Sequence, residues 1–226
     1  MPAARLTTDL YFTTSTVVDW MDVFTRPVYK HVIVQSLTHC QEQKGLDVYA
    51  WVLMTNHLHM IVGTREDGIS IGDIMRDFKK YTSKSILKAI QENKQESRKE
   101  WMLNRFGFRA ANDRKITNFK FWKDGNHVET ISSYDFYRQK LDYIHMNPVR
   151  QEIVQRPEEY LYSSARDYCG EKGLLNVLVQ PCGKYYCALQ MLIFNAAGLQ
   201  IQPNARARSC GSRCRSCGFA IRTPRI

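Results

Sequence analysis

The feature that most constrains the fold is a pair of strand-like segments joined by only three residues. Residues 47–53 ("DVYAWVL") and 57–63 ("HLHMIVG") are apolar and rich in strand-forming residues, and "MTN" between them fits a turn. The pair therefore predicts a β-hairpin. This hairpin carries two histidines, His57 and His59, at positions where valine or isoleucine would pack more easily.

Segments around the hairpin predict alternating strands and helices. Residues 11–18 have the β-branched and aromatic content of a first strand, and Pro27 can open a helix that runs to about Lys44. Residues 71–90 carry apolar side chains at helical spacing. Residues 91–118 are polar and irregular, and we expect an excursion there with some helix.

After residue 118 we expect a short strand or strand pair, and then a helix capped by Ser132 or Ser133. Pro148 is expected to end this helix near residue 146, because the residue before a proline avoids the α region. His145 is expected at the surface or at the helix end. The whole order of elements, closed by a short helix or turn in "PEEYLYSSARDY", predicts an α+β sandwich with helices on one face of an antiparallel sheet.

The net charge of +10 is concentrated in two regions, which indicates a polyanionic partner. Residues 76–123 hold fourteen Lys and Arg residues against five acids, and the residues after Pro181 hold seven against none. A helix over residues 71–90 would carry a basic ladder along one side, made of Arg76, Lys80, Lys84 and Lys88.

Two units are expected: a folded domain over residues 1–180 and a basic tail over residues 181–226. The tail, with "NARARSCGSRCRSCG", has no periodic apolar face and is expected to be disordered. Five of the seven cysteines lie in it, and an odd total without a secretion signal favours reduced thiols. No apolar run approaches the ~20 residues that span a bilayer, so a cytoplasmic protein with no membrane partner is expected.

The two histidines form a candidate metal site. Residues i and i+2 of a strand point to the same face, so His57 and His59 can reach one cation while Leu58 and Met60 pack on the other side. Imidazole binds zinc, manganese and similar ions. The same pattern occurs in zinc hydrolases and oxygenases, and one surface histidine beside one core histidine would explain it without a metal.

The segment "YRQKLDYIHMNPVR" supplies a candidate nucleophile. Tyr137, Leu141 and Ile144 form an apolar stripe, and Tyr143 lies on another side, about 100° from Ile144. Asn147 follows Tyr143 by one turn, at the expected frayed end, so the two side chains are directed toward one region. A phenol attacks a phosphodiester poorly unless a base or metal is close, so this tyrosine is chemically complementary to the histidine pair.

Taken in order, "WVLMTNHLHMIVG", "DFKKYT", "FW", "LDYIHMNPVR" and "PEEYLYSSARDY" resemble the single-tyrosine HUH transposases, closest to the REP-associated tyrosine transposases of bacteria. The resemblance covers residues 11–168. It implies a ferredoxin-like α+β domain in which His57 and His59 bind Mg²⁺ or Mn²⁺, with Asn147 as third ligand. Tyr143 would attack single-stranded or hairpin DNA, giving a 5′-phosphotyrosine link and a free 3′-OH for strand transfer.

The resemblance also implies a homodimer that acts on hairpin-forming ends of mobile DNA, at the bacterial nucleoid. The basic ladder fits a phosphate-tracking role by charge, and a solvated helix face is its alternative. Residues 91–118 and the tail have no counterpart in the family pattern. Two other functions stay open: a DNA-binding regulator derived from such a transposase, with its chemistry unused, and a zinc hydrolase acting on a small substrate.

Overall fold

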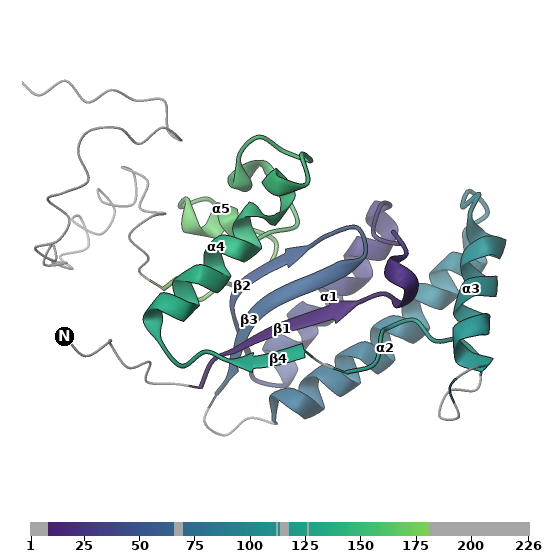
Figure 1. Ribbon diagram of the computed structural model, residues 1–226, viewed down its shortest axis with the longest axis horizontal. Coiled ribbons are helices and arrows are strands. Elements are labelled where there is room, and N and C mark those ends of the chain that lie inside the picture. The colour runs from purple at the N-terminus through teal and green to yellow at the C-terminus, as the bar shows by residue number, and fades with distance from the viewer. Residues whose placement is uncertain (1–8, 66–69, 112, 114–117, 126, 181–226) are drawn as a thin grey trace, which may run out of the picture.

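The computed structural model describes residues 9–65, 70–111, 113, 118–125 and 127–180, and its centre is a four-stranded sheet (Figure 1). The strand order is β2-β3-β1-β4, and all neighbouring strands are antiparallel. The predicted hairpin is present as β2 and β3. The strands are β1 (Tyr11–Thr16), β2 (Leu46–Leu53), β3 (His57–Thr64) and β4 (His127–Thr130).

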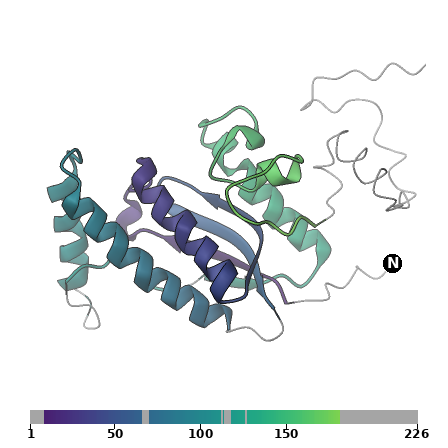
Figure 2. The same ribbon diagram turned by 180° about the vertical axis from the view of Figure 1, so that it is seen from behind.

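Helices lie on both sides of this sheet. Figure 2 shows α1 (Pro27–Gln43) and α2 (Ile71–Glu92) side by side across one face, the arrangement of a ferredoxin-like fold. Helix α4 (Tyr134–Arg150) comes after the last strand and packs against β2 and β3 from the opposite face. The remaining helical segments are η1 (Val18–Trp20), α3 (Lys99–Ala111), η2 (Pro157–Glu159) and α5 (Ala165–Tyr168).

Local sequence signals account for the ends of the two long helices on the ferredoxin-like face. Pro27 occupies the first turn of α1, where its fixed φ suits a helix and its missing N–H is not needed. Gly45 follows this helix with a φ of 68°, a conformation that favours glycine. Ser70 caps α2, since its hydroxyl accepts a hydrogen bond from the backbone N–H of Asp73.

Helix α4 departs from the sequence-based expectation at its C-terminal end. It begins after Ser133, one of the two predicted caps, but it runs through Pro148 and ends at Arg150. A proline inside a helix removes one N–H donor and crowds the preceding turn. Packing outweighs this preference here, because Asn147 and Pro148 are both buried. The prediction that the helix ends near residue 146 is therefore wrong, and Asn147 lies on regular helix.

Two other predicted segments take a simpler form than expected. The strand or strand pair after residue 118 is present as β4 with one isolated bridge, between Val17 and Trp122. The predicted tail at 181–226 lies outside the described residues. Among the helices that the structure does describe, none is long and apolar enough to cross a membrane.

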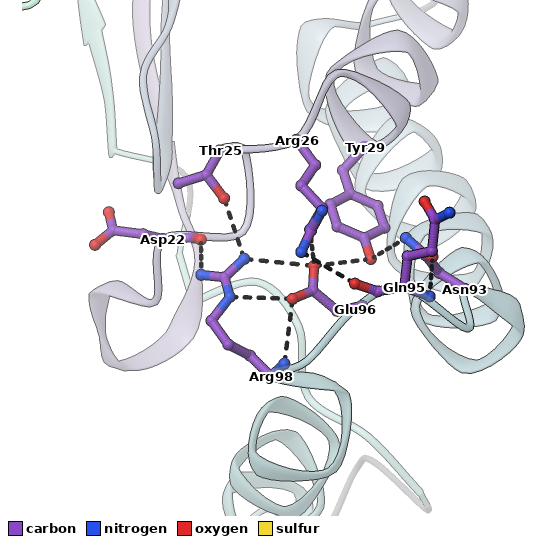
Figure 3. Close-up of polar contacts among 8 residues, drawn as sticks. All are labelled: Asp22, Thr25, Arg26, Tyr29, Asn93, Gln95, Glu96 and Arg98. Carbon is purple, nitrogen blue, oxygen red and sulfur yellow. Dashed lines mark hydrogen bonds and ion pairs between the residues drawn. The ribbon is translucent and has the colours of Figure 1, made fainter.

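A buried carboxylate ties the start of α1 to the connection between α2 and α3 (Figure 3). The side chain of Glu96 has no exposed surface. Three side chains donate hydrogen bonds to the Glu96 carboxylate: Arg26 at 2.6 Å, Arg98 at 3.1 Å and Tyr29 at 3.3 Å. Arg98 also donates to the backbone oxygen of Asp22 at 2.9 Å, so this hydrogen-bond network reaches the segment after η1.

This network predicts a pH-dependent contribution to stability. Burial raises the pKa of Glu96, but hydrogen bonds from Arg98 and Arg26 outweigh burial and hold the pKa below its ordinary value. Such a carboxyl stabilises the fold above the ordinary pKa of ~4.3, and the contribution is lost as the pH falls below it. We expect Glu96→Gln to lower the free energy of unfolding at neutral pH by about 1–3 kcal/mol and to flatten the acid limb, measured by urea denaturation.

Glu92→Gln is the matched control for this substitution. Glu92 is exposed and lies 3.7 Å from Lys88, so its removal should change stability by less than about 0.5 kcal/mol. Equal losses in the two variants would contradict the role assigned to Glu96.

Candidate active site

The two histidines lie on the face of β3 that α4 covers. The strand register pairs Thr14 of β1 with His59, and the His57 and His59 ring centroids are 4.7 Å apart. Leu58 and Met60 alternate with them, point to the face of α1 and α2, and have no exposed surface. The sheet therefore separates an imidazole-bearing face from the face that packs against α1 and α2.

Tyr143 extends from α4 onto this imidazole-bearing face. Its hydroxyl lies 3.3 Å from Nε2 of His59, and the two ring centroids are 5.0 Å apart. Phe12 packs on both rings, stacked on His59 at 5.5 Å and edge-on to Tyr143 at 6.2 Å. Tyr143 is 38% exposed, so part of this residue is open to solvent.

Two buried polar bridges hold α4 in this position. His145 is completely buried, whereas the sequence predicted a position at the surface or at the helix end. Its Nε2 lies 2.8 Å from the hydroxyl of Ser164. This hydroxyl accepts a hydrogen bond from the backbone N–H of Trp51 in β2. Burial lowers the pKa of His145 to about 3, so the ring is neutral. In the second bridge, Tyr137 contacts the hydroxyl of Tyr168 at 2.7 Å, and Tyr168 donates to a carbonyl oxygen of β2.

Asn56 fixes the orientation and tautomer of His57. The Asn56 side-chain amide donates to the Trp20 carbonyl at 3.1 Å and to the Asp22 carboxylate at 2.9 Å. Its oxygen therefore faces Nδ1 of His57, at 2.7 Å, and this oxygen can only accept. It follows that Nδ1 carries the proton and Nε2 keeps its lone pair. Asn56 directly precedes His57 in the turn, yet the motif alone did not identify its role.

His59 is held in a similar way. The Thr14 hydroxyl lies 2.8 Å from its Nδ1, which leaves Nε2 toward Tyr143. Burial lowers the pKa of His57 to about 4; burial, together with the neighbouring His57 and Lys140, lowers that of His59 to about 3. Both rings are therefore neutral at pH 7, which is the protonation state that binds metal ions.

The donors around these rings limit which metal site is possible. Within the described residues, no three His, Cys, Asp or Glu side chains surround a common position. A metal at His57 and His59 therefore needs a ligand of another kind. Asn147 is one turn beyond Tyr143 on α4 and is 7% exposed, and its amide oxygen is a donor that Mg²⁺ and Mn²⁺ accept. The two neutral, oriented imidazoles suit such an ion, and the Asn147 amide is a candidate oxygen ligand on the same helix as Tyr143.

Two cations on α4 lie close to the candidate site and were not identified from the sequence. The Lys140 amino group lies 4.2 Å from the Phe12 ring centroid and 2.7 Å from the Glu129 carboxylate. The Arg150 guanidinium lies 5.7 Å from the Tyr143 ring centroid. They stand three residues before and seven after Tyr143, so helical spacing contained the signal for both.

The structure does not bring the predicted basic ladder to this site. The ladder lies on α2, on the opposite side of the sheet, where Arg76 and Lys88 pair with carboxylates of the same helix. Lys80 and Lys84 have no ion pair within the described chain. With Tyr81 and residues of α1 they line a cavity of about 500 Å³ between the two helices.

Comparisons with known proteins find a similar sequence family and a similar fold. Residues 19–112 match the family described as "Transposase IS200 like". A solved structure of a REP-associated tyrosine transposase bound to a REP hairpin superposes with a TM-score of 0.50 at 16% identity, over 81% of this chain and 94% of that chain. A search of curated proteins gives no match.

The fold defines the class: an α+β domain of ferredoxin-like topology, shared with that solved transposase. Over residues 19–112 the chain is similar to the IS200-like transposases, and the resemblance expected from its motifs is confirmed. The matched segment contains both histidines and the basic ladder, but it ends before α4. The position of Tyr143 is therefore an observation of the structure that is independent of the family match.

The pKa shifts predict how the two imidazoles behave in solution. We expect His57 and His59 to stay neutral from roughly pH 5 upward, because their pKa values lie at about 4 and about 3. Histidine-selective ¹⁵N NMR should show a protonated Nδ1 on His57, and Asn56→Ala should remove this preference. An unfolded histidine peptide, with a pKa near ~6.5, is the reference. A midpoint above pH 6 for either ring would refute the assignment.

Proposed function

We propose that this protein is a single-tyrosine transposase that cleaves and rejoins single-stranded DNA through Tyr143. The observation that carries the proposal is the 3.3 Å contact between the Tyr143 hydroxyl and His59 Nε2, which joins segments 84 positions apart. An exposed phenol beside two oriented, neutral imidazoles suits nucleophilic attack on a phosphodiester.

In the proposed step, the phenol oxygen of Tyr143 forms a bond to phosphorus while the bond from phosphorus to the 3′ oxygen breaks. The phenol proton passes to solvent, and the departing oxygen takes up a proton. The products are a 5′-phosphotyrosine and a free 3′-OH. Attack on the phosphotyrosine by another 3′-OH reverses the bond changes and completes strand transfer.

We propose that His57, His59 and Asn147 hold Mg²⁺ or Mn²⁺ beside this tyrosine. When bound, such an ion withdraws charge from the phosphate oxygens and makes phosphorus more electrophilic. The chain's own contribution is to keep both rings neutral by burial and to hold each Nδ1 with a hydrogen-bonding partner, Asn56 or Thr14. Regular helix at Asn147 supports its part, since a frayed end would aim the amide poorly.

The proposed partner is single-stranded or hairpin DNA of the bacterial chromosome, bound by a catalytic domain over residues 1–180. The net charge of +10 supports a polyanionic substrate, and Arg150 adds positive charge near Tyr143. The solved relative was bound to a REP hairpin. A homodimer stays a prediction; it is not needed to deliver the tyrosine, because Tyr143 and His59 meet within one chain.

An adduct assay tests the nucleophile. We expect wild-type protein with Mn²⁺ and a 3′-labelled hairpin oligonucleotide to give a denaturation-resistant protein–DNA adduct, and Tyr143→Phe to abolish it while single-strand affinity changes less than about twofold. The reason is that the substitution removes only the attacking oxygen. A chelator should also abolish the adduct without removing binding.

Tyr81→Phe is the matched control, because Tyr81 is 61% exposed on α2 and belongs to the motif "FKKYT". An adduct that survives in Tyr143→Phe but disappears in Tyr81→Phe would overturn the assignment. Binding without any adduct across many sequences would favour the DNA-binding regulator. Tight zinc retention without DNA affinity would favour the small-molecule hydrolase.

The basic ladder is proposed to contact the phosphates of DNA that extends beyond the site. Lys80 and Lys84 are the members without ion pairs in the described chain, so we expect Lys80→Ala/Lys84→Ala to weaken binding of long hairpins and to reduce the salt slope by roughly 1.5–2. Arg76→Ala/Lys88→Ala is the control, since those charges are already paired. Fluorescence anisotropy at several salt concentrations measures the binding affinity and its salt slope. Identical slopes for the wild type and both double variants would show that the ladder is only a solvated helix face.

A further inference from the structure

Trp20 is a large apolar side chain exposed directly beside the candidate site. It is 57% exposed, and its ring centroid lies 6.0 Å from that of His57, with the rings inclined at 77°. A single exposed aromatic residue needs no explanation by itself. The position of Trp20 suggests a role in binding, because neighbouring groups hold it next to the residues proposed to act on DNA.

The backbone that presents Trp20 adopts a conformation that ordinary residues avoid. Asp19 has a φ of 54° and Trp20 a φ of 55°, both in the left-handed region that favours glycine. Contacts from elsewhere hold it there: Asp19 pairs with Arg105 and Arg109 of α3, and the Trp20 carbonyl accepts the amide of Asn56. Such strain persists where the surroundings impose it, often at ligand sites.

The charge beside the indole suits a nucleotide. The amino group of Lys123 lies 5.8 Å from the Trp20 ring centroid. An aromatic face with an adjacent cation is the combination that binds single-stranded nucleic acid, since the ring stacks on a base and the cation meets the phosphate. Trp101 is similarly exposed, at 54%, but it lies on α3 and no contact joins it to the histidines.

We propose that Trp20 stacks on an unpaired nucleobase flanking the phosphate that Tyr143 attacks, on the His57 side of the site. This rests on the proposed function, because it takes single-stranded DNA as the ligand. Stacking tolerates all four bases, since each has a π-face, so Trp20 positions the strand without reading its sequence. Asn56 hydrogen-bonds both the Trp20 carbonyl and Nδ1 of His57, so it links the position of Trp20 to the orientation of His57.

An abasic scan tests the stacking contact. The full chain carrying Tyr143→Phe is used to select a tight single-stranded ligand from a random pool, so that binding is measured without cleavage. Abasic residues are then introduced one position at a time. We expect Trp20→Leu to weaken binding of the intact strand about 5- to 150-fold, the range of one base stack. One abasic position should cause a similar loss in the Trp20 protein and almost no further loss in Trp20→Leu.

Trp20→Phe should retain most of the affinity and the position-specific abasic loss, because it keeps an aromatic face. Trp101→Leu is the matched control and should leave both unchanged. The proposal would be overturned if the Trp20 protein and Trp20→Leu gave the same abasic profile. It would also be overturned if Trp101→Leu altered the profile as strongly as Trp20→Leu does. If Trp20→Leu does not fold, a Trp20→Phe protein with no position-specific abasic loss overturns it equally. Adduct formation by the wild-type chain reports separately on the proposed function.

Discussion

The placement of α4 on the sheet decides whether this chain has a site with a tyrosine in it. His145 and Tyr137 each begin a chain of buried hydrogen bonds that ends on β2. The two residues are eight positions apart, which is about two helical turns. Two such anchors fix the rotation of the helix as well as its tilt. A rotation by one residue, about 100°, would carry the Tyr143 hydroxyl away from His59. The contact of 3.3 Å therefore depends on groups that take no part in it.

Patterns that act over a few residues were sufficient to predict the hairpin of β2 and β3 and the start of α1 and α2. They failed where contacts between residues far apart in the sequence determine the local structure. The local preference of Pro148 predicted a helix end, but burial of this segment keeps α4 regular to Arg150. His145 was expected at the surface or at the helix end, yet it is buried, and Ser164, nineteen positions later, supplies a hydrogen-bonding partner. A polar residue can be buried when the fold brings it a partner, and local sequence does not show the partner.

The candidate site shows the same division. Spacing alone placed His57 and His59 on one face, and helical geometry related Asn147 to Tyr143. What orients the histidines could not be foreseen, because Asn56 depends on Asp22, and Asp22 is held in turn by Arg98 from the α2–α3 connection. That connection falls in the polar segment of residues 91–118, which was expected to have no counterpart in the family, although the family match runs to residue 112 and covers most of it. The excursion packs its α3 and the Glu96 network against the segment that adjoins the site (Figure 3).

Tyr143 and His59 meet within a single polypeptide, which has a consequence for how the site behaves on dilution. Sites shared between subunits come apart when the protein concentration falls below the dissociation constant of the assembly. Here the effective concentration of the phenol at the imidazole is set by the fold and does not change with the amount of protein. Even a few molecules in a cell would each carry both halves of the site.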